Sequence, residues 1–269
     1  MPGIIQQGEG LPIVVVPGIQ GRWAWMAPTM DALAAHGRAI TYSLCDEPTS
    51  GFAWSTDFGF ENYLAQLDDV LVATGADRPV LVGVSYGGLV AAEYAARHPG
   101  RVAGLVIASA PPPTWTPDRR VRRYLVAPRL LAPAFWLGAP LRAYPELKAS
   151  IPDMRSRLRF AVRQGLRVVT ALPSSGRMAR RLQWLQQAQF GHDRPMDVPA
   201  LVVTGEPSLE RVVPPRLTAE YLTWLPRARA VTMPGTGHAG TITQSHEFAA
   251  LVADFAAGLP QAGPVARRA

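Results

Sequence analysis

The sequence predicts an α/β fold, in which a mostly parallel central sheet is flanked by helices and carries one long helical insertion. Three observations support this class. Short apolar runs, typical of strands buried on both faces, alternate along the chain with helical patterns. The segment 110–198 contains no strand-like pattern. A chain of 269 residues with 48% hydrophobic content is long enough to bury a large core.

The first elements are marked by apolar runs and turn residues. The run at 11–16 precedes Pro-Gly and predicts the first clear strand. A helix over 24–36 and a strand over 38–44 follow. Asp57 is expected to cap the next helix, which Gly75 closes.

The remaining elements continue the same alternation. In chain order they are a strand at 79–84, a helix at 86–97, strands at 101–109, 199–205 and 229–234, and a last helix at 243–258. Strands that alternate with helices require right-handed crossovers, and therefore a mostly parallel sheet.

The segment that follows the strand ending near Ser109 is predicted to be a helical cap. Proline-rich stretches bound it, and apolar residues recur inside it at helical spacing. Because open α/β folds bind ligands at the carboxyl edge of the sheet, we expect the insertion to act as a lid. The predicted division is a core of residues 1–110 and 197–262, a cap of residues 111–196 and a flexible tail at 263–269.

Positive charge is concentrated in this insertion. Residues 114–190 hold 15 Arg or Lys and three acidic residues, a net charge of +12, whereas the whole chain carries +7. Such a block can attract acidic small molecules, nucleic acid or an anionic membrane, although a solvated helical surface is the simpler interpretation. We expect no nucleic-acid partner. An anionic substrate remains an alternative, because the arginines at 119, 120, 122 and 123 could bind a carboxylate or phosphate group.

Several protein classes are excluded. The single cysteine, Cys45, rules out an internal disulfide framework and a cysteine-based zinc site. The first residues lack the pattern of a secretory signal, and no apolar stretch approaches the roughly 20 residues of a membrane span. We therefore expect a cytoplasmic protein without a membrane span. No phosphate-binding loop, metal-ligand cluster or dinucleotide motif is present, so no cofactor or metal is expected. The oligomeric state is left open.

The sequence GVSYG at 83–87 matches the pattern G-x-S-x-G. It lies between an apolar run and an amphipathic helical pattern, so it occupies a strand-to-helix turn. Gly83 and Gly87 permit close backbone packing there. The N–H groups at the start of the helix favour developing negative charge. Ser85 is therefore a candidate nucleophile.

With these residues, nearly the whole chain resembles the α/β-hydrolase superfamily. GVSYGG is similar to its nucleophile elbow, and PGIQGRWAW at 17–25 is similar to its HG-x-x-G-x-x-x-W loop. The resemblance implies that the backbone N–H groups of Ile19 and Tyr86 form an oxyanion hole. Pro17 stands where the family usually has histidine, which backbone donors do not need. The resemblance also implies a shortened N-terminal hairpin.

The candidate base is His238, in the Gly-rich segment MPGTGHAG that follows the last predicted strand. This place resembles that of the family's catalytic histidine, which takes the serine proton and returns it to the leaving group. The other histidines fit the chemistry less well. They are His36 and His98 near helix ends, His246 inside the last helix, and His192 at the exit of the insertion, where a substrate contact is possible.

The candidate acid lies in LVVTGEPSLERVVPP at 201–215, because the family's chain order is Ser, acid, His. Counting three residues forward from Gly205 reaches Ser208, which carries no charge. The family pattern ends in Asp-x-x-Val-Pro, and aligning its Val-Pro with Val213-Pro214 places Glu210 at the position of the acid. The loop is then two residues longer than usual. Glu206 remains the alternative.

These residues predict a serine hydrolase that forms an acyl-enzyme on Ser85, with a small ester-like substrate. Other acyl or carbon–carbon bond hydrolysis uses the same groups, and a non-catalytic ligand-binding protein of the same fold is a further alternative. The predicted pocket residues are Gly18, Trp23, Trp25 and Tyr86 from the core, and Trp115, Phe135 and Trp136 from the insertion.

Overall fold

The computed structural model describes residues 3–190 and 195–260, and the side chains of Arg120, Ala134 and Phe135 are not among those it describes. The predicted tail at 263–269 and His192 lie outside the described residues.

Seven strands form one sheet in the order β1-β3-β2-β4-β5-β6-β7, with β1 antiparallel to β3 and all other pairs parallel. The strands are β1 (Ile4–Gln7), β2 (Pro12–Val16), β3 (Arg38–Tyr42), β4 (Val80–Val84), β5 (Gly104–Ala108), β6 (Ala200–Gly205) and β7 (Ala228–Met233). This arrangement confirms the predicted α/β-hydrolase fold class. The short strand β1 was not predicted.

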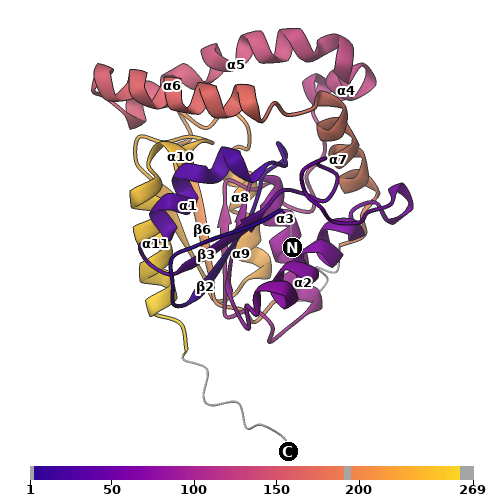
Figure 1. Ribbon diagram of the computed structural model, residues 1–269, viewed down its shortest axis with the longest axis vertical. Coiled ribbons are helices and arrows are strands. Elements are labelled where there is room, and N and C mark those ends of the chain that lie inside the picture. The colour runs from indigo at the N-terminus through magenta and orange to yellow at the C-terminus, as the bar shows by residue number, and fades with distance from the viewer. Residues whose placement is uncertain (1–2, 191–194, 261–269) are drawn as a thin grey trace, which may run out of the picture.

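Helices cover both faces of the sheet (Figure 1). Alternate side chains of the central strands point to opposite faces: Ile13 and Val15 pack with the first helix and the last, while Val14 and Val16 pack on the other side. The helices of the first face are α1 (Ala27–Leu33) and α11 (Ser245–Ala257), and those of the second are α2 (Glu61–Thr74), α3 (Tyr86–Arg97) and α9 (Tyr221–Trp224). The remaining short helices of the core are η1 (Trp23–Met26), η2 (Thr56–Phe58), α8 (Pro215–Thr218) and α10 (Gly240–Thr243).

Two local predictions are corrected. The helix predicted at 24–36 is divided into η1 and α1, whereas the helix predicted at 243–258 is found as α11, with the separate short helix α10 before it. Asp57 does not cap α2, because it lies within the turn η2, where its own N–H donates to the Ser55 hydroxyl, and the residue at the N-cap of α2 is Phe60. Gly75, in contrast, ends α2 in the left-handed conformation, as predicted.

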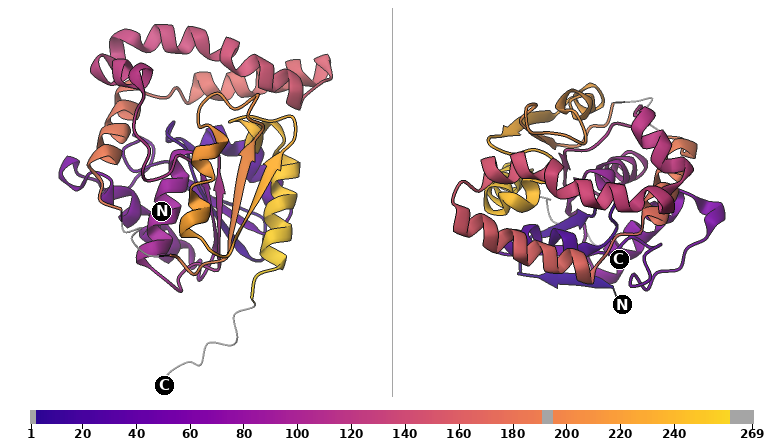
Figure 2. Two further views of the ribbon diagram at one scale, coloured as in Figure 1. Left: turned by 180° about the vertical axis from the view of Figure 1, so that it is seen from behind. Right: turned by 90° about the horizontal axis from the view of Figure 1, so that it is seen from above.

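In the described residues between β5 and β6 lie four helices, which are called the helical insertion below: α4 (Arg119–Val126), α5 (Pro128–Ser150), α6 (Met154–Thr170) and α7 (Ser175–Gln187). Helices α5 and α6 lie across the carboxyl ends of the strands (Figure 2). Helix α7 packs Trp184 and Leu185 into the core beside the sheet. In residues 3–190 and 195–260 no helix is both long and apolar enough to cross a membrane.

Candidate active site

Ser85 occupies a strained turn between β4 and α3. Its φ of 53° lies in a region that side chains other than glycine rarely adopt, which costs on the order of 1–3 kcal/mol. A side chain at Gly83 or Gly87 would collide with backbone atoms of the neighbouring segments. The Ser85 N–H donates to the carbonyl of Ala108 at 2.8 Å, which holds the turn above the sheet.

His238 faces Ser85 from the loop that follows β7. Its Nε2 lies 3.1 Å from the Ser85 Oγ, although the two residues are 153 positions apart in the chain. That distance is short enough for a hydrogen bond through which a proton can pass.

Glu210 lies on the opposite side of the imidazole. The His238 Nδ1 is 3.3 Å from the Glu210 carboxylate, whose Oε1 also accepts from the N–H groups of Val212 and Val213 at 2.8 and 3.0 Å. Burial raises the pKa of Glu210, but these hydrogen bonds and the one to His238 outweigh burial and hold the pKa below its usual value. Glu210 is therefore set to remain an anion beside the ring.

Glu206, the alternative acid, has a different environment. Its Oε1 accepts from the Gly235 N–H at 2.9 Å, and its backbone carbonyl accepts from the Glu210 N–H. Glu206 thus joins the acid loop to the histidine loop without being the carboxylate at His238. The Ser208 hydroxyl lies 3.5 Å from its other oxygen.

The predicted oxyanion groups flank the serine. Tyr86 is the first residue of α3, so its N–H has no carbonyl partner one turn earlier within the helix. A Cβ placed on Gly18 would lie 3.5 Å from the Ser85 Cβ, which puts the loop containing Ile19 beside Ser85. Gly21 closes that loop by donating to the Gly18 carbonyl at 2.9 Å.

The sequence of residues 13–251 matches the model of the family described as the alpha/beta hydrolase family. The chain belongs to this family.

Known relatives and structures agree with this assignment. Proteins named carbamate hydrolase RutD are 27% identical over 96% of this chain in Klebsiella pneumoniae and 25% identical over 92% in Escherichia coli, and the matches cover 95% and 91% of those proteins. An esterase of Exiguobacterium antarcticum has the same fold, with a TM-score of 0.77, 16% identity and coverage of 95% of both chains. A thermophilic esterase of Thermogutta terrifontis has a TM-score of 0.72, with 20% identity over 94% of this chain and 92% of that one.

A buried ionic cluster ties the helical insertion of this hydrolase to the loop at Ile19. The fully buried Arg181 of α7 donates to the Ile19 carbonyl at 2.6 Å and pairs with Asp46 and Glu47 at 2.6 and 2.7 Å. Burial raises the pKa of Glu47, but Arg181 and two further arginines outweigh burial and lower it. Sequence analysis missed this cluster, and the only available signal was an Asp-Glu pair directly after a predicted strand.

A second contact links the helical insertion to the histidine loop. Glu146 of α5 is buried, and its Oε1 accepts from the Ala239 N–H at 2.8 Å. Burial raises the pKa of this carboxyl group, although the N–H groups of Gly237 and Ala239 and the nearby His238 act in the opposite direction. This residue was also missed. Its signal was that it is the only acidic residue of a helix rich in leucine and proline.

The predicted pocket residues are only partly brought together. Trp25 and Trp136 approach each other with ring centres 6.4 Å apart, and the Trp25 Nε1 donates to the Ala171 carbonyl at 3.0 Å. Trp115 is partly buried and packs against the core, and the backbone N–H of Trp23 donates to the Ser43 hydroxyl. The side chain of Phe135 lies outside the described residues.

The prediction that the Tyr86 side chain lines the pocket is wrong. Its ring is buried against Phe60 and Tyr63, and its hydroxyl donates to the Arg181 carbonyl at 3.3 Å. The helix start that exposes the Tyr86 N–H turns its side chain into the core.

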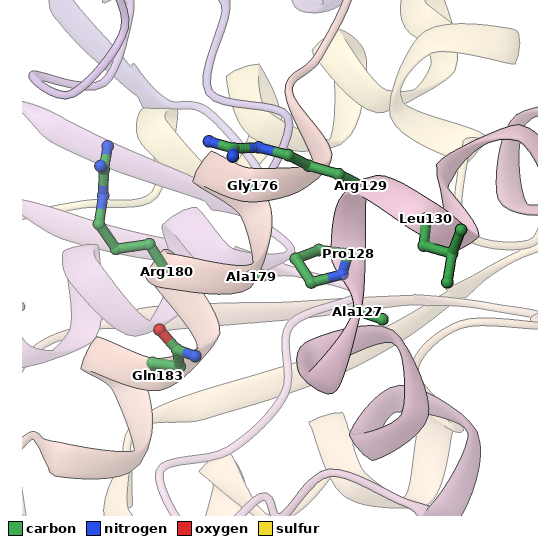
Figure 3. A pocket seen from close by; sticks show the side chains of 8 residues that line it. All are labelled: Ala127, Pro128, Arg129, Leu130, Gly176, Ala179, Arg180 and Gln183. Atoms are coloured by element: carbon green, nitrogen blue, oxygen red, sulfur yellow. The ribbon is translucent and has the colours of Figure 1, made fainter.

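Among the cavities of the described residues, two are lined by the helical insertion. The larger, of about 460 Å³, lies between the α4–α5 junction and α7, where Pro128 faces the side of Ala179 (Figure 3). The smaller, of about 120 Å³, is mostly apolar and is lined by Trp136 among others. Neither is lined by Ser85, Glu210 or His238. In the described part of the chain, no group of three or more His, Cys, Asp or Glu side chains is placed to hold a metal ion.

Proposed function

We propose that this hydrolase cleaves carboxylic esters through an acyl-enzyme on Ser85. The observation that carries the proposal is the single line of contacts from the Ser85 Oγ to His238 and on to Glu210, at 3.1 and 3.3 Å. Ester cleavage is favoured because two of the structural neighbours are esterases, which supports the chemistry by analogy.

In the proposed first step, the Ser85 Oγ attacks the carbonyl carbon while its proton passes to the His238 Nε2. Glu210 keeps the other ring nitrogen protonated and stabilises the imidazolium. The proton then moves to the alcohol that leaves. Water, activated by His238, attacks the acyl-enzyme, and the proton returns to Ser85 as the acid is released.

The N–H groups of Ile19 and Tyr86 are proposed to bind the negative charge that develops on the carbonyl oxygen. One such donor is worth about 3 kcal/mol of transition-state stabilisation. Arg181 supports this role for Ile19, because it fixes the opposite side of the same residue.

The helical insertion is proposed to be a cap over the site, with residues 111–196 as its extent. The support is its place across the carboxyl ends of the strands (Figure 2) and its contacts to the loops at Ile19 and His238. That Trp25 and Trp136 line the substrate pocket, and that the substrate carries an anionic group, remain predictions.

A carbamate is the second candidate substrate, because the curated relatives are named carbamate hydrolases. Attack on a carbamate carbonyl uses the same nucleophile and oxyanion donors. Assays of an ester and of the matching carbamate, on the same enzyme, separate the two.

The test is a fluorophosphonate probe followed by mass spectrometry of the labelled peptide. We expect one adduct, on Ser85, and no adduct in Ser85→Ala. A chain-length series of p-nitrophenyl esters on both proteins then sizes the acyl site. A folded wild-type protein that neither reacts with the probe nor hydrolyses any ester or carbamate would overturn the proposal.

A further inference from the structure

The outer side of the helical insertion is unusually apolar. Helices α5 and α6 expose large hydrophobic side chains there, each between 54% and 80% accessible. We call this set the outer apolar face, and it consists of Leu130, Leu137, Leu141 and Tyr144 on α5 and Met154, Leu158, Val162, Leu166 and Val169 on α6. Exposure of this many large apolar side chains on neighbouring helices is typical of an interaction surface in soluble proteins.

Helical spacing places these side chains on one side of each helix. The α6 members recur every three or four residues and so share one side of the helix. The other side of α6 faces the core, where the Gln164 Nε2 donates to the Trp25 carbonyl at 3.3 Å. On α5 the buried Glu146 marks the inward side. The two helices run beside each other over the same end of the molecule (Figure 2).

Positive charge borders this face. Arg155, Arg159 and Arg163 are exposed and recur every four residues along α6, next to its apolar stripe. Further exposed positive charges lie at Arg122, Arg123, Arg129 and Lys148.

Negative charge is almost absent there. Of the three acidic residues in the segment 114–190, Glu146 is buried against the histidine loop. Asp118 and Asp153 each cap a helix, accepting from the N–H groups of Val121 and Ser156 at 2.8 and 2.7 Å. The surface therefore combines exposed apolar side chains with nearly unopposed arginine.

We propose that the outer apolar face docks on an anionic lipid surface. Helices that lie in a membrane interface combine an apolar stripe with Lys or Arg beside it, so that the stripe enters the acyl boundary while the cations meet lipid phosphates. A second copy of this chain would oppose arginine with arginine. Nucleic acid would match the charge and leave the leucines without partners. The docking is peripheral and does not depend on the proposed chemistry at Ser85.

The experiment is flotation of the full chain with vesicles of phosphatidylcholine alone, or of phosphatidylcholine mixed with phosphatidylglycerol. We expect binding to the mixed vesicles, little binding to the neutral ones, and weakening as salt is added, because screening shortens the reach of the arginines.

Two triple variants separate the contributions of charge and apolar contact. Arg155, Arg159 and Arg163, all changed to Gln, should lower the affinity for anionic vesicles on the order of a hundredfold, since each interfacial cation contributes roughly a factor of five. The second variant combines Leu158→Asn, Val162→Asn and Leu166→Asn. It should bind more weakly than wild type even at low salt.

A third variant is the matched control. Arg78, Arg227 and Arg229 are exposed at the amino ends of the strands, at the end of the sheet remote from α5 and α6. Changing these three to Gln removes the same charge, and binding should stay within about twofold of wild type, because surface potentials decay within a Debye length. All variants alter exposed residues, and circular dichroism verifies their folding.

Several outcomes would overturn the proposal. These are no binding to anionic vesicles at low salt, equal loss in the control variant, or vesicle binding that the asparagine variant leaves unchanged. A dimer in size-exclusion chromatography that only the asparagine variant dissociates, without vesicle binding, would assign the face to a second copy. DNA binding without vesicle binding would assign it to nucleic acid.

Discussion

Two glutamates of one loop hold different positions around His238. Glu210 contacts the His238 Nδ1, whereas Glu206 receives the Gly235 N–H at 2.9 Å. We expect Glu210→Gln to lower kcat on the order of 10⁴-fold, because an amide no longer holds the imidazole in its productive tautomer. Glu206→Gln should change kcat by less than about tenfold, because an amide oxygen can still accept from Gly235.

Steady-state kinetics on p-nitrophenyl acetate, with folding verified by thermal unfolding, measures both variants. If Glu206→Gln lost activity while Glu210→Gln kept it, the assignment of the acid would be reversed.

The pH dependence of stability tests the environment of the buried carboxyl group of Glu146. Its pKa in the folded protein is raised above the ordinary value, so the folded state holds this proton more tightly than the unfolded state does. Wild type must therefore lose stability relative to Glu146→Gln as the pH rises from the unfolded pKa through the folded one. Above that window the difference in free energy of unfolding between the two proteins is constant. Below it, the part of the difference that arises from ionisation of Glu146 disappears.

Urea unfolding at several pH values from about 4 to 8 measures this difference, since glutamate ionises in that region when its pKa is raised. The exposed Glu247→Gln serves as the control for loss of one surface carboxylate. A stability difference between Glu146→Gln and wild type that is the same at every pH would contradict the prediction.

Arg181 is the fully buried arginine of α7 and connects this helix to Asp46, Glu47 and Ile19. Arg181→Met leaves Asp46 and Glu47 with fewer buried partners, and breaking a buried pair costs roughly 3–5 kcal/mol. It also frees the Ile19 carbonyl, so kcat should fall more than the affinity for substrate. Arg180→Met is the comparison, because Arg180 also pairs with Asp46 but remains partly exposed and does not contact Ile19. Equal effects of the two variants on kcat, measured where both are folded, would argue against a positioning role for Arg181.

The elements differ in how far the sequence could predict them. Strands β4 and β6 and helix α3 were readable, because apolar runs and turn glycines are local signals. The four residues of β1 have no such run, and they become a strand only because β3 offers an edge. Ser85 and His238 were found from local motifs. Arg181 could not be, since its partner Asp46 is 135 positions away and nothing local marks the pairing.

The whole molecule combines a closely packed sheet with a loosely attached helical insertion. Strands β2, β4 and β5 are buried almost throughout, whereas α6 has no buried residue and Glu146 is the only buried residue among the side chains of α5 that the structure describes. Since few buried contacts hold α5 and α6, they should open locally at a small fraction of the free energy of global unfolding. Helix α7 is different, because Trp184, Leu185 and Arg181 are buried in the core.

Hydrogen exchange followed by mass spectrometry should therefore show rapid exchange in 128–170, slow exchange in 175–187 and the slowest in β4 and β5. In Glu146→Gln the first segment should exchange within a few-fold of wild type, whereas Arg181→Met should accelerate exchange in α7. Equal protection of α6 and β4 would mean that the helical insertion unfolds only together with the sheet.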